Sequence, residues 1–402
     1  MSSDRADAST VLAALDVLLD GARHASSDAL PDLLAAAGRT MGWQVVAHLV
    51  TFDQCRLVPL GAEGTTRAVD DEAGAGLAFR SMAPTTDADG DHWIPLLDGA
   101  ERLGVLRVRA LPGGPDPRDR AADLGRLASL TGHLVAVLSP SGDAITRVRG
   151  AGDRRVEAEI IWNLLPPLTF TAPDVVISGL LEPCEKVAGD LFDYAVEGTT
   201  AQFAILDGTG HDLRAGLLAS VALATYRNHR RRGADLATCG RMIDETMHGH
   251  TDGAGYATGV LARLDTATGR FDYLNAGHPH PLLLRGGRVV RALEHPGRGM
   301  FGLGAQDLGT GHEQLEPGDR VILYTDGITE ARADDGTFFG LDRLVTLLEE
   351  HAVAQRPAPE TLRLVVRSVL EHHRGVLRDD ATLMIIEWAP PERREVRPGH
   401  VG

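Results

Sequence analysis

Apolar residues recur along the chain with two different periods, and the change from one to the other divides it. Before about residue 140 the pattern predicts helices within residues 10–42 and a closing helix at 118–138. Between them the predicted strands are 44–51, 56–60, 92–97 and 103–110. Asp98-Gly99 between the last two strands is typical of a hairpin turn. This order of elements predicts a small α+β domain.

From residue 175 onward, short apolar strands dominate and are joined by turn-like dipeptides such as Gly286-Gly287. The predicted strands are 175–180, 201–206, 257–264, 270–276, 281–284, 288–292, 320–324 and 381–387. The predicted helices are 213–231, 236–248, 341–351 and 359–372, the last of which opens on Pro359. Hairpin-linked strands with amphipathic helices between them predict an α+β fold, a central antiparallel β-sandwich flanked by helices.

Local composition marks the boundaries between these regions. Residues 139–153 are rich in Gly, Ser and charge, and an amphipathic stretch at 154–165 ends at Pro166-Pro167. We therefore expect a first domain over 1–140, a linker and connector helix over 141–168, a second domain over 169–390 and a disordered tail over 391–402.

Composition and charge exclude several classes of protein. The 402 residues suffice for two or three domains, and 40 Lys+Arg against 56 Asp+Glu give a net charge of −16. Such an acidic chain repels nucleic acid and anionic membrane surfaces. The three cysteines are widely spaced, and the sequence shows no signal peptide and no apolar run of membrane-spanning length. These features predict a cytoplasmic protein.

Aspartates stand at the ends of four predicted strands in the second domain. Asp207-Gly208 and Asp326-Gly327 follow strands, whereas Asp190 and the pair Asp379-Asp380 precede apolar segments. If the sheets bring these carboxylates together, each pair about 4 Å apart repels by about 4 kcal/mol at an effective dielectric constant of 20. Hard divalent cations such as Mg²⁺ or Mn²⁺ would relieve that repulsion, since they prefer oxygen ligands. A glycine at 208 lets the backbone approach closely, so that its carbonyl can be a further ligand.

Other polar motifs have more ordinary interpretations. His278 and His280 flank a proline in a turn and are expected to shape a tight loop. Arg227, together with Arg230, Arg231 and Arg232, forms a basic helix end that is either solvated or in contact with an acidic partner. No P-loop, zinc-protease or hydrolase nucleophile motif occurs.

Five ordered motifs between residues 155 and 390 identify the second domain by resemblance. They are V-A-G-D-L-F-D-Y (187–194), I-L-D-G-T-G-H (205–211), N-A-G-H-P-H-P (275–281), L-Y-T-D-G-I-T-E-A-R (323–332) and R-D-D-A-T-L (378–383). This set resembles the SpoIIE/RsbU-type bacterial branch of the metal-dependent serine/threonine protein phosphatases, the PPM family.

The resemblance implies two Mn²⁺ or Mg²⁺ ions held between the sheets of the sandwich. By motif, the implied metal ligands are Asp190, Asp207, the carbonyl of Gly208, Asp326 and Asp379, with Asp207, Asp326 and Asp379 also assigned as catalytic. Asp380 is an alternative to Asp379, because the two are adjacent. A water that bridges the metals would attack phosphorus directly, with no covalent intermediate. The expected Gly-Gly-Asp is Ala188-Gly189-Asp190 here, and His211 is not assigned a catalytic role.

The first domain resembles a GAF-type sensor domain, most clearly in its hairpin segment WIPLLDGAERLGVLRVRA (93–110). The two resemblances together imply a phosphatase that dephosphorylates an anti-anti-sigma (STAS-domain) protein in sigma-factor partner switching. A small molecule or a protein would signal through the first domain, and the chain would form a homodimer. The alternative is a non-catalytic scaffold with a phosphatase fold that binds phosphoprotein partners.

Overall fold

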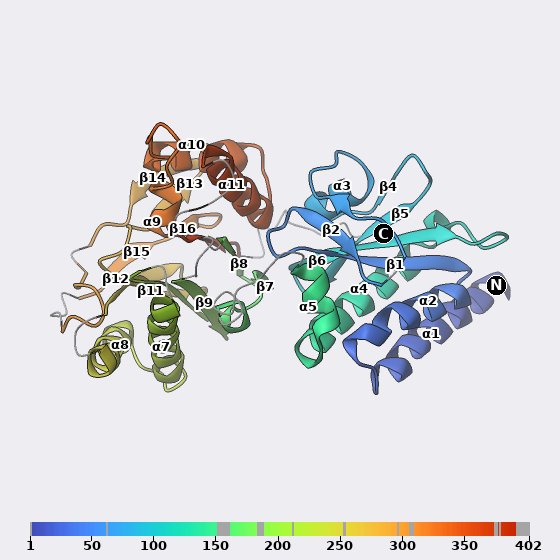
Figure 1. Cartoon of the computed structure of the whole chain (residues 1–402), viewed down its shortest axis with the longest axis horizontal. Helices are drawn as coiled ribbons and strands as arrows, with labels where there is room; N and C mark the ends of the chain where they lie inside the picture. The colour runs from blue at the N-terminus through green and yellow to red at the C-terminus, as the bar shows by residue number, and fades with distance from the viewer. Residues whose placement is uncertain are drawn as a thin grey trace. The chain divides into compact units, whose positions relative to one another are not determined.

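The chain folds into two compact units, which are described one at a time. The computed structural model describes residues 2–61, 63–150, 161–182, 189–210, 213–251, 255–295, 297–304, 309–373, 377 and 379–390. Described residues up to 150 belong to the first unit, and those from 161 onward belong to the second (Figure 1). None of the helices in the described parts is both long and apolar enough to cross a membrane.

The first unit is built on one antiparallel sheet of six strands in the order β3-β2-β1-β6-β5-β4. The strands are β1 (Trp43–Val50), β2 (Arg56–Pro59), β3 (Arg67–Ala68), β4 (Thr85–Thr86), β5 (His92–Asp98) and β6 (Glu101–Ala110). β5 and β6 form the predicted hairpin, in which Asp98 pairs with Glu101. The turn is therefore Gly99-Ala100, one residue later than expected, and Gly99 takes the positive φ of 60° that such a turn requires.

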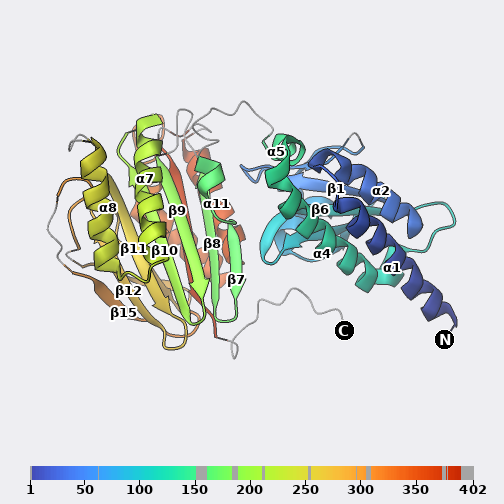
Figure 2. The same cartoon turned by 90° about the horizontal axis from the view of Figure 1, so that it is seen from below.

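Helices cover both faces of this sheet and divide its core in two. The helices are α1 (Ser2–Ala22), α2 (Leu30–Thr40), α3 (Gly74–Ser81), α4 (Ala121–Leu138) and α5 (Asp143–Arg149). α1, α2 and α4 share one face, where Leu34, Trp43 and Leu127 are fully or almost fully buried (Figure 2). α3 lies against the other face, where Phe79 and Trp93 form a smaller core.

The second unit is a sandwich of two antiparallel sheets. One sheet has the order β15-β12-β11-β10-β9 and the other β14-β13-β16-β17-β8-β7. The first contains β9 (Asp190–Glu197), β10 (Thr200–Gly208), β11 (Ala257–Asp265), β12 (Arg270–Ala276) and β15 (Gly311–Gln314). The second contains β7 (Thr169–Ala172), β8 (Val175–Glu182), β13 (Leu282–Arg285), β14 (Arg288–Ala292), β16 (Arg320–Tyr324) and β17 (Ala381–Trp388).

Helices pack on the outer face of each sheet, as the two views show (Figures 1 and 2). They are α7 (Leu213–Arg230), α8 (Leu236–Thr251), α9 (Asp326–Thr329), α10 (Leu341–Val353) and α11 (Ala358–His372). Between the sheets the fit is close, since a Cβ added at Gly179 of β8 would lie 2.5 Å from the Phe192 ring of β9. The predicted class, an antiparallel β-sandwich flanked by helices, is confirmed.

The boundary between the units lies later than the predicted residue 140. Residues 143–149 form α5, whose Ile145 is fully buried in the core of the first unit. The Arg149 carbonyl accepts a hydrogen bond of 2.9 Å from the Phe52 amide. Because residues 143–149 are mostly polar, the sequence pattern gave no sign that Ile145 is buried. At the other end of the predicted linker, Ile161 and Leu168 belong to the core of the second unit. Residues 151–160 and the predicted tail at 391–402 lie outside the described residues.

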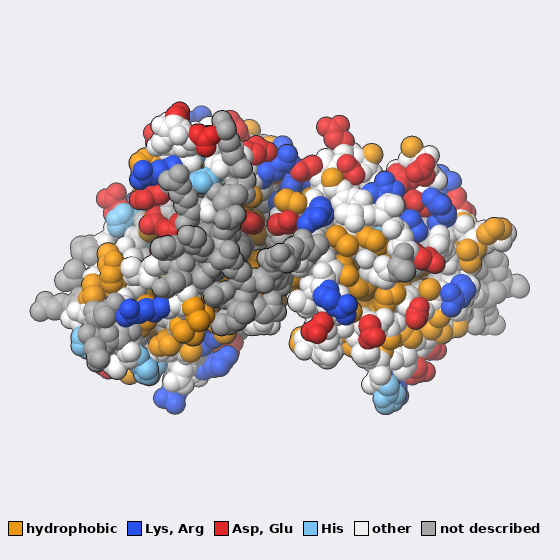
Figure 3. Space-filling view, in the orientation of Figure 1, with side chains coloured by type: hydrophobic (Ala, Val, Ile, Leu, Met, Phe, Trp, Pro, Cys, Tyr) orange, Lys and Arg blue, Asp and Glu red, His pale blue; other side chains and the backbone are white. Residues whose placement is uncertain are grey.

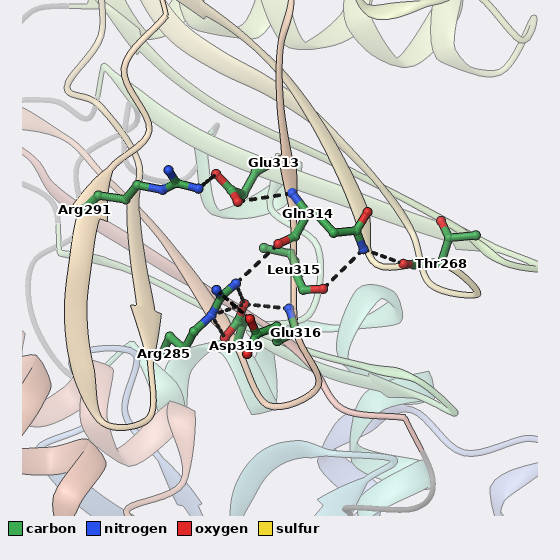
Figure 4. Close-up of polar contacts among 8 residues, drawn as sticks. All are labelled: Thr268, Arg285, Arg291, Glu313, Gln314, Leu315, Glu316 and Asp319. Carbon is green, nitrogen blue, oxygen red and sulfur yellow. Dashed lines mark hydrogen bonds and ion pairs between the residues drawn. The ribbon is translucent and has the colours of Figure 1, made fainter.

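A polar network fastens the two sheets of the second unit together at β13 and β15 (Figure 4). The Arg285 guanidinium on β13 donates to both oxygens of Asp319, at 2.9 and 2.6 Å, and to the Gln314 carbonyl of β15 at 3.3 Å. Arg291 on β14 forms an ion pair with Glu313, also on β15. The side chain of Asp319 is only 2% exposed, so Arg285 neutralises a buried carboxylate while it joins the sheets.

Replacement of Arg285 by alanine should therefore destabilise the second unit. Because Asp319 would remain buried and unpaired, we expect Arg285→Ala to lower the free energy of unfolding by about 2–4 kcal/mol. Arg270→Ala removes an ion pair to Asp272 whose arginine is 63% exposed, and should cost less than about 1 kcal/mol. Urea unfolding of the full chain measures the free energy of unfolding of both variants. Equal losses in the two would contradict the role of Arg285 in neutralising the buried Asp319.

Candidate metal centre

Two of the predicted acids meet through the pairing of adjacent strands. In the register of β9 with β10, Asp190 lies directly opposite Asp207. Phe192 pairs with Ile205 two residues further along, and the Phe192 ring fills the space between the sheets. Because side chains alternate along a strand, Asp190 and Asp207 point to that same inner face. The site therefore starts as a carboxylate pair at one end of the sandwich.

The opposite sheet holds Asp190 in place. The hydroxyl of Thr325, which follows β16, donates to Asp190 Oδ2 at 2.8 Å, and the hydroxyl of Thr382 on β17 donates at 2.6 Å. Asp190 is 2% exposed and the two threonines are fully buried. One carboxylate oxygen is thus fixed by two hydroxyls, which leaves the other oxygen available for a further ligand.

Asp326 and Asp380 are positioned by an unusually close approach of two backbone segments. Asp326 begins α9 directly after Thr325, and a Cβ added at the next residue, Gly327, would lie 1.8 Å from the Asp380 carbonyl oxygen. Only glycine leaves room for this contact. Asp380 is buried, and its carboxylate accepts a hydrogen bond from the Gly189 amide beside Asp190. The segment before β17 is thereby tied to the start of β9.

The adjacent acids Asp379 and Asp380 take different positions. The Asp380 carboxylate is buried against Gly189, whereas Asp379 is exposed and accepts a 3.0 Å hydrogen bond from the Asp380 amide. Asp380 thus has a bracing role between two segments. Asp379 is the exposed member of the pair, although the charges of both members act on Asp207.

The electrostatics of the site show carboxylates whose burial and mutual repulsion favour their protonated forms. Burial raises the pKa of Asp207 to about 8, and the charges of Asp326, Asp379 and Asp380 add to the effect. Burial, followed by the charges of Asp207 and Asp380, likewise raises the pKa of Asp190 well above its usual range. The two threonine hydroxyls oppose this shift only in part. The pKa of Asp326 is also raised by burial.

The donors fit a hard divalent cation in their chemistry. All are carboxylate or carbonyl oxygens, and a cation would remove the repulsion that raises these pKa values. Gly208 allows the close backbone approach that its position predicts, since a Cβ there would lie 2.4 Å from the Ala215 carbonyl oxygen. Within the described ranges, however, no three Asp, Glu, His or Cys side chains already stand together as a finished metal-binding group. Water ligands, which Mg²⁺ usually retains, would complete such an open cluster.

The histidine motif has the structural role that its turn predicts. Asn275 binds the backbone of His278 through two hydrogen bonds of 2.8 Å, and the His278 ring contacts the Thr258 hydroxyl at 2.7 Å. Thr258 lies opposite Asp207 in the pairing of β10 with β11. The loop therefore supports the strand end that carries Asp207.

The basic end of α7 is paired within the chain at Arg227 and Arg230 and exposed at Arg231 and Arg232. Arg227 and Arg230 each donate to the buried carboxylate of Asp193 at 2.6 Å, and the Arg230 side chain is 8% exposed. Asp193 lies on β9 but faces the opposite side from Asp190. The acidic partner of this cluster is thus within the chain.

Sequence reasoning missed Thr325 and Thr382. Both are part of the motifs L-Y-T-D-G and R-D-D-A-T-L, but a threonine beside an aspartate is common in strands and turns. The one feature of the sequence that could have indicated a role for these threonines is that they stand in the same motifs as the predicted acids. Ala188 and His211, at which the motifs depart from the family pattern, lie outside the described residues.

Comparisons with known proteins agree with this architecture. Residues 197–389 match the family described as Stage II sporulation protein E (SpoIIE). The chain is 28% identical over 275 residues to Protein IcfG of Synechocystis sp., covering 58% of this chain and 42% of that protein. It is 24% identical over 212 residues to Phosphoserine phosphatase RsbU of Bacillus subtilis, covering 52% of this chain and 62% of that protein.

A solved structure containing the RsbU and RsbW domains of Rv1364c from Mycobacterium tuberculosis is 25% identical, with a TM-score of 0.49, and the match covers 55% of this chain and 62% of that one. The chain spans 42% and 62% of the length of the two curated relatives above. The match to the SpoIIE family, over residues 197–389, lies within the second unit.

Proposed function

We propose that the second unit is a divalent-metal-dependent phosphatase of phosphoserine and phosphothreonine in proteins. The observation that carries this proposal is the convergence of carboxylates from four separate segments, whose charges together with burial raise the pKa values of Asp190 and Asp207. The match to the SpoIIE family supports it, as does the name phosphoserine phosphatase carried by the relative from B. subtilis.

The residues divide into ligands and supports. Asp190, Asp207, Asp326, Asp379 and the carbonyl of Gly208 would hold two Mn²⁺ or Mg²⁺ ions. When bound, the ions supply an activated water for attack on phosphorus and neutralise charge on the transferred phosphoryl group. Thr325 and Thr382 hold Asp190 in one orientation, while Asp380 fastens the segments that carry Asp190 and Asp379.

The natural substrate in this proposal is a phosphorylated anti-anti-sigma protein with a STAS domain. Dephosphorylation of that protein would begin a partner switch that releases a sigma factor. We further propose that the chain acts in the cytoplasm as a homodimer and that the GAF-like first unit regulates it. The resemblance of the two units to these families supports this placement.

Loss of a proposed ligand should abolish catalysis. We expect Asp207→Asn and Asp326→Asn each to lower the rate of hydrolysis of p-nitrophenyl phosphate and of a phosphoserine STAS protein, with Mn²⁺ present, by at least about 100-fold. Asp272→Asn removes a half-buried acid on β12 that forms an ion pair with Arg270, and should leave both rates unchanged. Equal rates in wild type and both ligand variants would contradict the metal assignment. Inactivity of the wild type itself towards both substrates would favour the scaffold alternative.

Loss of the hydroxyls that hold Asp190 should weaken metal binding. Thr382→Val keeps the side-chain shape but removes one donor to Asp190, and we expect the Mn²⁺ affinity to fall by about 10–100-fold. Thr346→Val, on the outer face of α10, removes a hydroxyl bound only to its own helix and serves as the control. Calorimetric titration with Mn²⁺ measures both. An unchanged affinity in Thr382→Val would show that Asp190 is not a ligand.

The metal-free protein should lose stability as the pH rises. The pKa of Asp207 is about 8 in the folded state, above its usual value of 3.8, so folding favours the protonated form. Its stabilising effect is complete below about pH 4 and is lost as the pH rises through 8. With EDTA present, we expect Tm to fall between pH 5 and pH 8, by about 2–4 °C for each kcal/mol lost. Asp207→Asn should flatten this dependence, and so should Mn²⁺. A profile that is the same for wild type and variant would contradict the shifted pKa.

A further inference from the structure

Three nitrogen-bearing side chains lie together on the α3 face of the sheet in the first unit. In the registers of β1 with β6 and β2, His48 lies opposite Val105 and Pro59, and Val46 lies opposite Arg107. Side-chain alternation therefore places His48 and Arg107 on one face. Arg67 of β3 reaches the same place, because its guanidinium carbon is 5.9 Å from the centre of the Trp93 ring, which in turn lies 5.1 Å from the centre of the His48 ring.

The buried nitrogens of this cluster lack hydrogen-bond partners among the described residues. His48 is fully buried, yet neither Nδ1 nor Nε2 has a partner of ordinary geometry, and the same holds for the buried Nε atoms of Arg67 and Arg107. Both arginines are only half-buried as whole residues, so the rest of each side chain extends toward the surface. Buried polar atoms nearly always have a partner. The two arginine Nε atoms without a described partner, beside a buried imidazole that has the carbonyls of Val46 and Thr65 near it, therefore indicate a site for something that supplies acceptors.

The charges at this place are positive. Burial lowers the pKa of His48 to about 4, and the charges of Arg107 and Arg67 lower it further, although the nearby carbonyls of Val46 and Thr65 act in the opposite direction. The ring is thus neutral at pH 7 and offers one N–H donor. No acid contributes to this shift.

Two neighbouring polar side chains on the same face, Arg109 and Trp93, have acidic partners, which sets the cluster apart. Arg109, two residues after Arg107, forms a bidentate pair with Asp91 at 2.6 and 2.9 Å. The Trp93 ring nitrogen donates to Asp87 at 2.8 Å. Asp87 and Asp91 are therefore already engaged, and within the described part of the chain Arg67 and Arg107 have no ion pair, so that they can receive an outside anion.

We propose that His48, Arg67 and Arg107 form a binding site in the first unit for a small oxyanion, the phosphate or carboxylate group of a diffusible molecule. Two guanidinium groups suit such a group because each presents parallel N–H donors to its oxygens. The neutral imidazole lies next to them and adds no charge that would repel the arginines. Gly64 borders the site, since a Cβ added there would lie 3.2 Å from His48 Nε2. This proposal does not depend on the phosphatase activity of the second unit.

The test uses the full chain, freed of metal with EDTA so that the carboxylates of the second unit repel anions. Inorganic phosphate and succinate are titrated separately by calorimetry at constant ionic strength. We expect saturable binding of at least one of them, and Arg67→Gln and Arg107→Gln should each weaken it by at least 10-fold. Arg126→Gln on α4 removes the same charge from the same unit, where Arg126 is 58% exposed and bound to Asp123, and should bind like wild type.

The outcomes separate the proposal from simpler explanations. Binding of phosphate but not succinate would identify a phosphoryl ligand, and the reverse would identify a carboxylate ligand. Absence of binding for both anions would overturn the proposal and leave the cluster as a hydrated pocket. Equal weakening in Arg126→Gln would also overturn it, because the interaction would then follow net charge alone. Thermal unfolding of each variant without ligand checks that the fold is intact.

Discussion

Burial of the Asp190 carboxylate between two sheets is the constraint around which the second unit is arranged. A carboxylate that is 2% exposed requires partners, and the strand that carries Asp190 supplies none of those observed. Both hydroxyl donors, Thr325 and Thr382, come from the opposite sheet. The site therefore exists only when the sandwich is closed. Its geometry is a property of the packing of the sheets and not of any one loop.

The two Asp-Gly pairs serve this arrangement for a steric reason. Neither Gly208 nor Gly327 has a positive φ, so neither is present for a left-handed turn. Both lie where another backbone segment comes too close for a Cβ, the Ala215 carbonyl in one case and the Asp380 carbonyl in the other. Each aspartate is thus followed by a point of backbone contact. Such contacts fix the position of the preceding carboxylate more firmly than a surface hairpin would.

The sequence predicts strand positions well where apolar residues alternate without interruption. The strands at 270–276, 288–292 and 320–324 have the predicted bounds, and the antiparallel sandwich follows from them. Short or polar elements escape prediction, as α5 shows, because its one fully buried residue, Ile145, gives no periodicity. The acids at strand ends were visible in the sequence because each stands beside an apolar run.

Interactions across the sheets were not visible in the sequence, for a physical reason. The hydroxyls that hold Asp190 are more than 130 residues away along the chain, and nothing local distinguishes them from other strand threonines. The same holds for Arg227 and Arg230, whose acidic partner Asp193 lies more than 30 residues earlier, on the face of β9 that α7 covers. Composition shows a basic helix end, but only the fold shows what neutralises it.

Charge balance distinguishes functional from structural polar groups in this chain. On the visible face of each unit, acidic and basic side chains are interspersed, although the net charge is −16 (Figure 3). The buried acids Asp193 and Asp319 are each matched by arginine. Imbalance remains where Asp190 and Asp207 meet in the second unit and where Arg67 and Arg107 flank His48 in the first. Because an unmatched buried charge costs folding free energy, these two imbalances are best explained by ligands of opposite charge, a cation in one unit and an anion in the other.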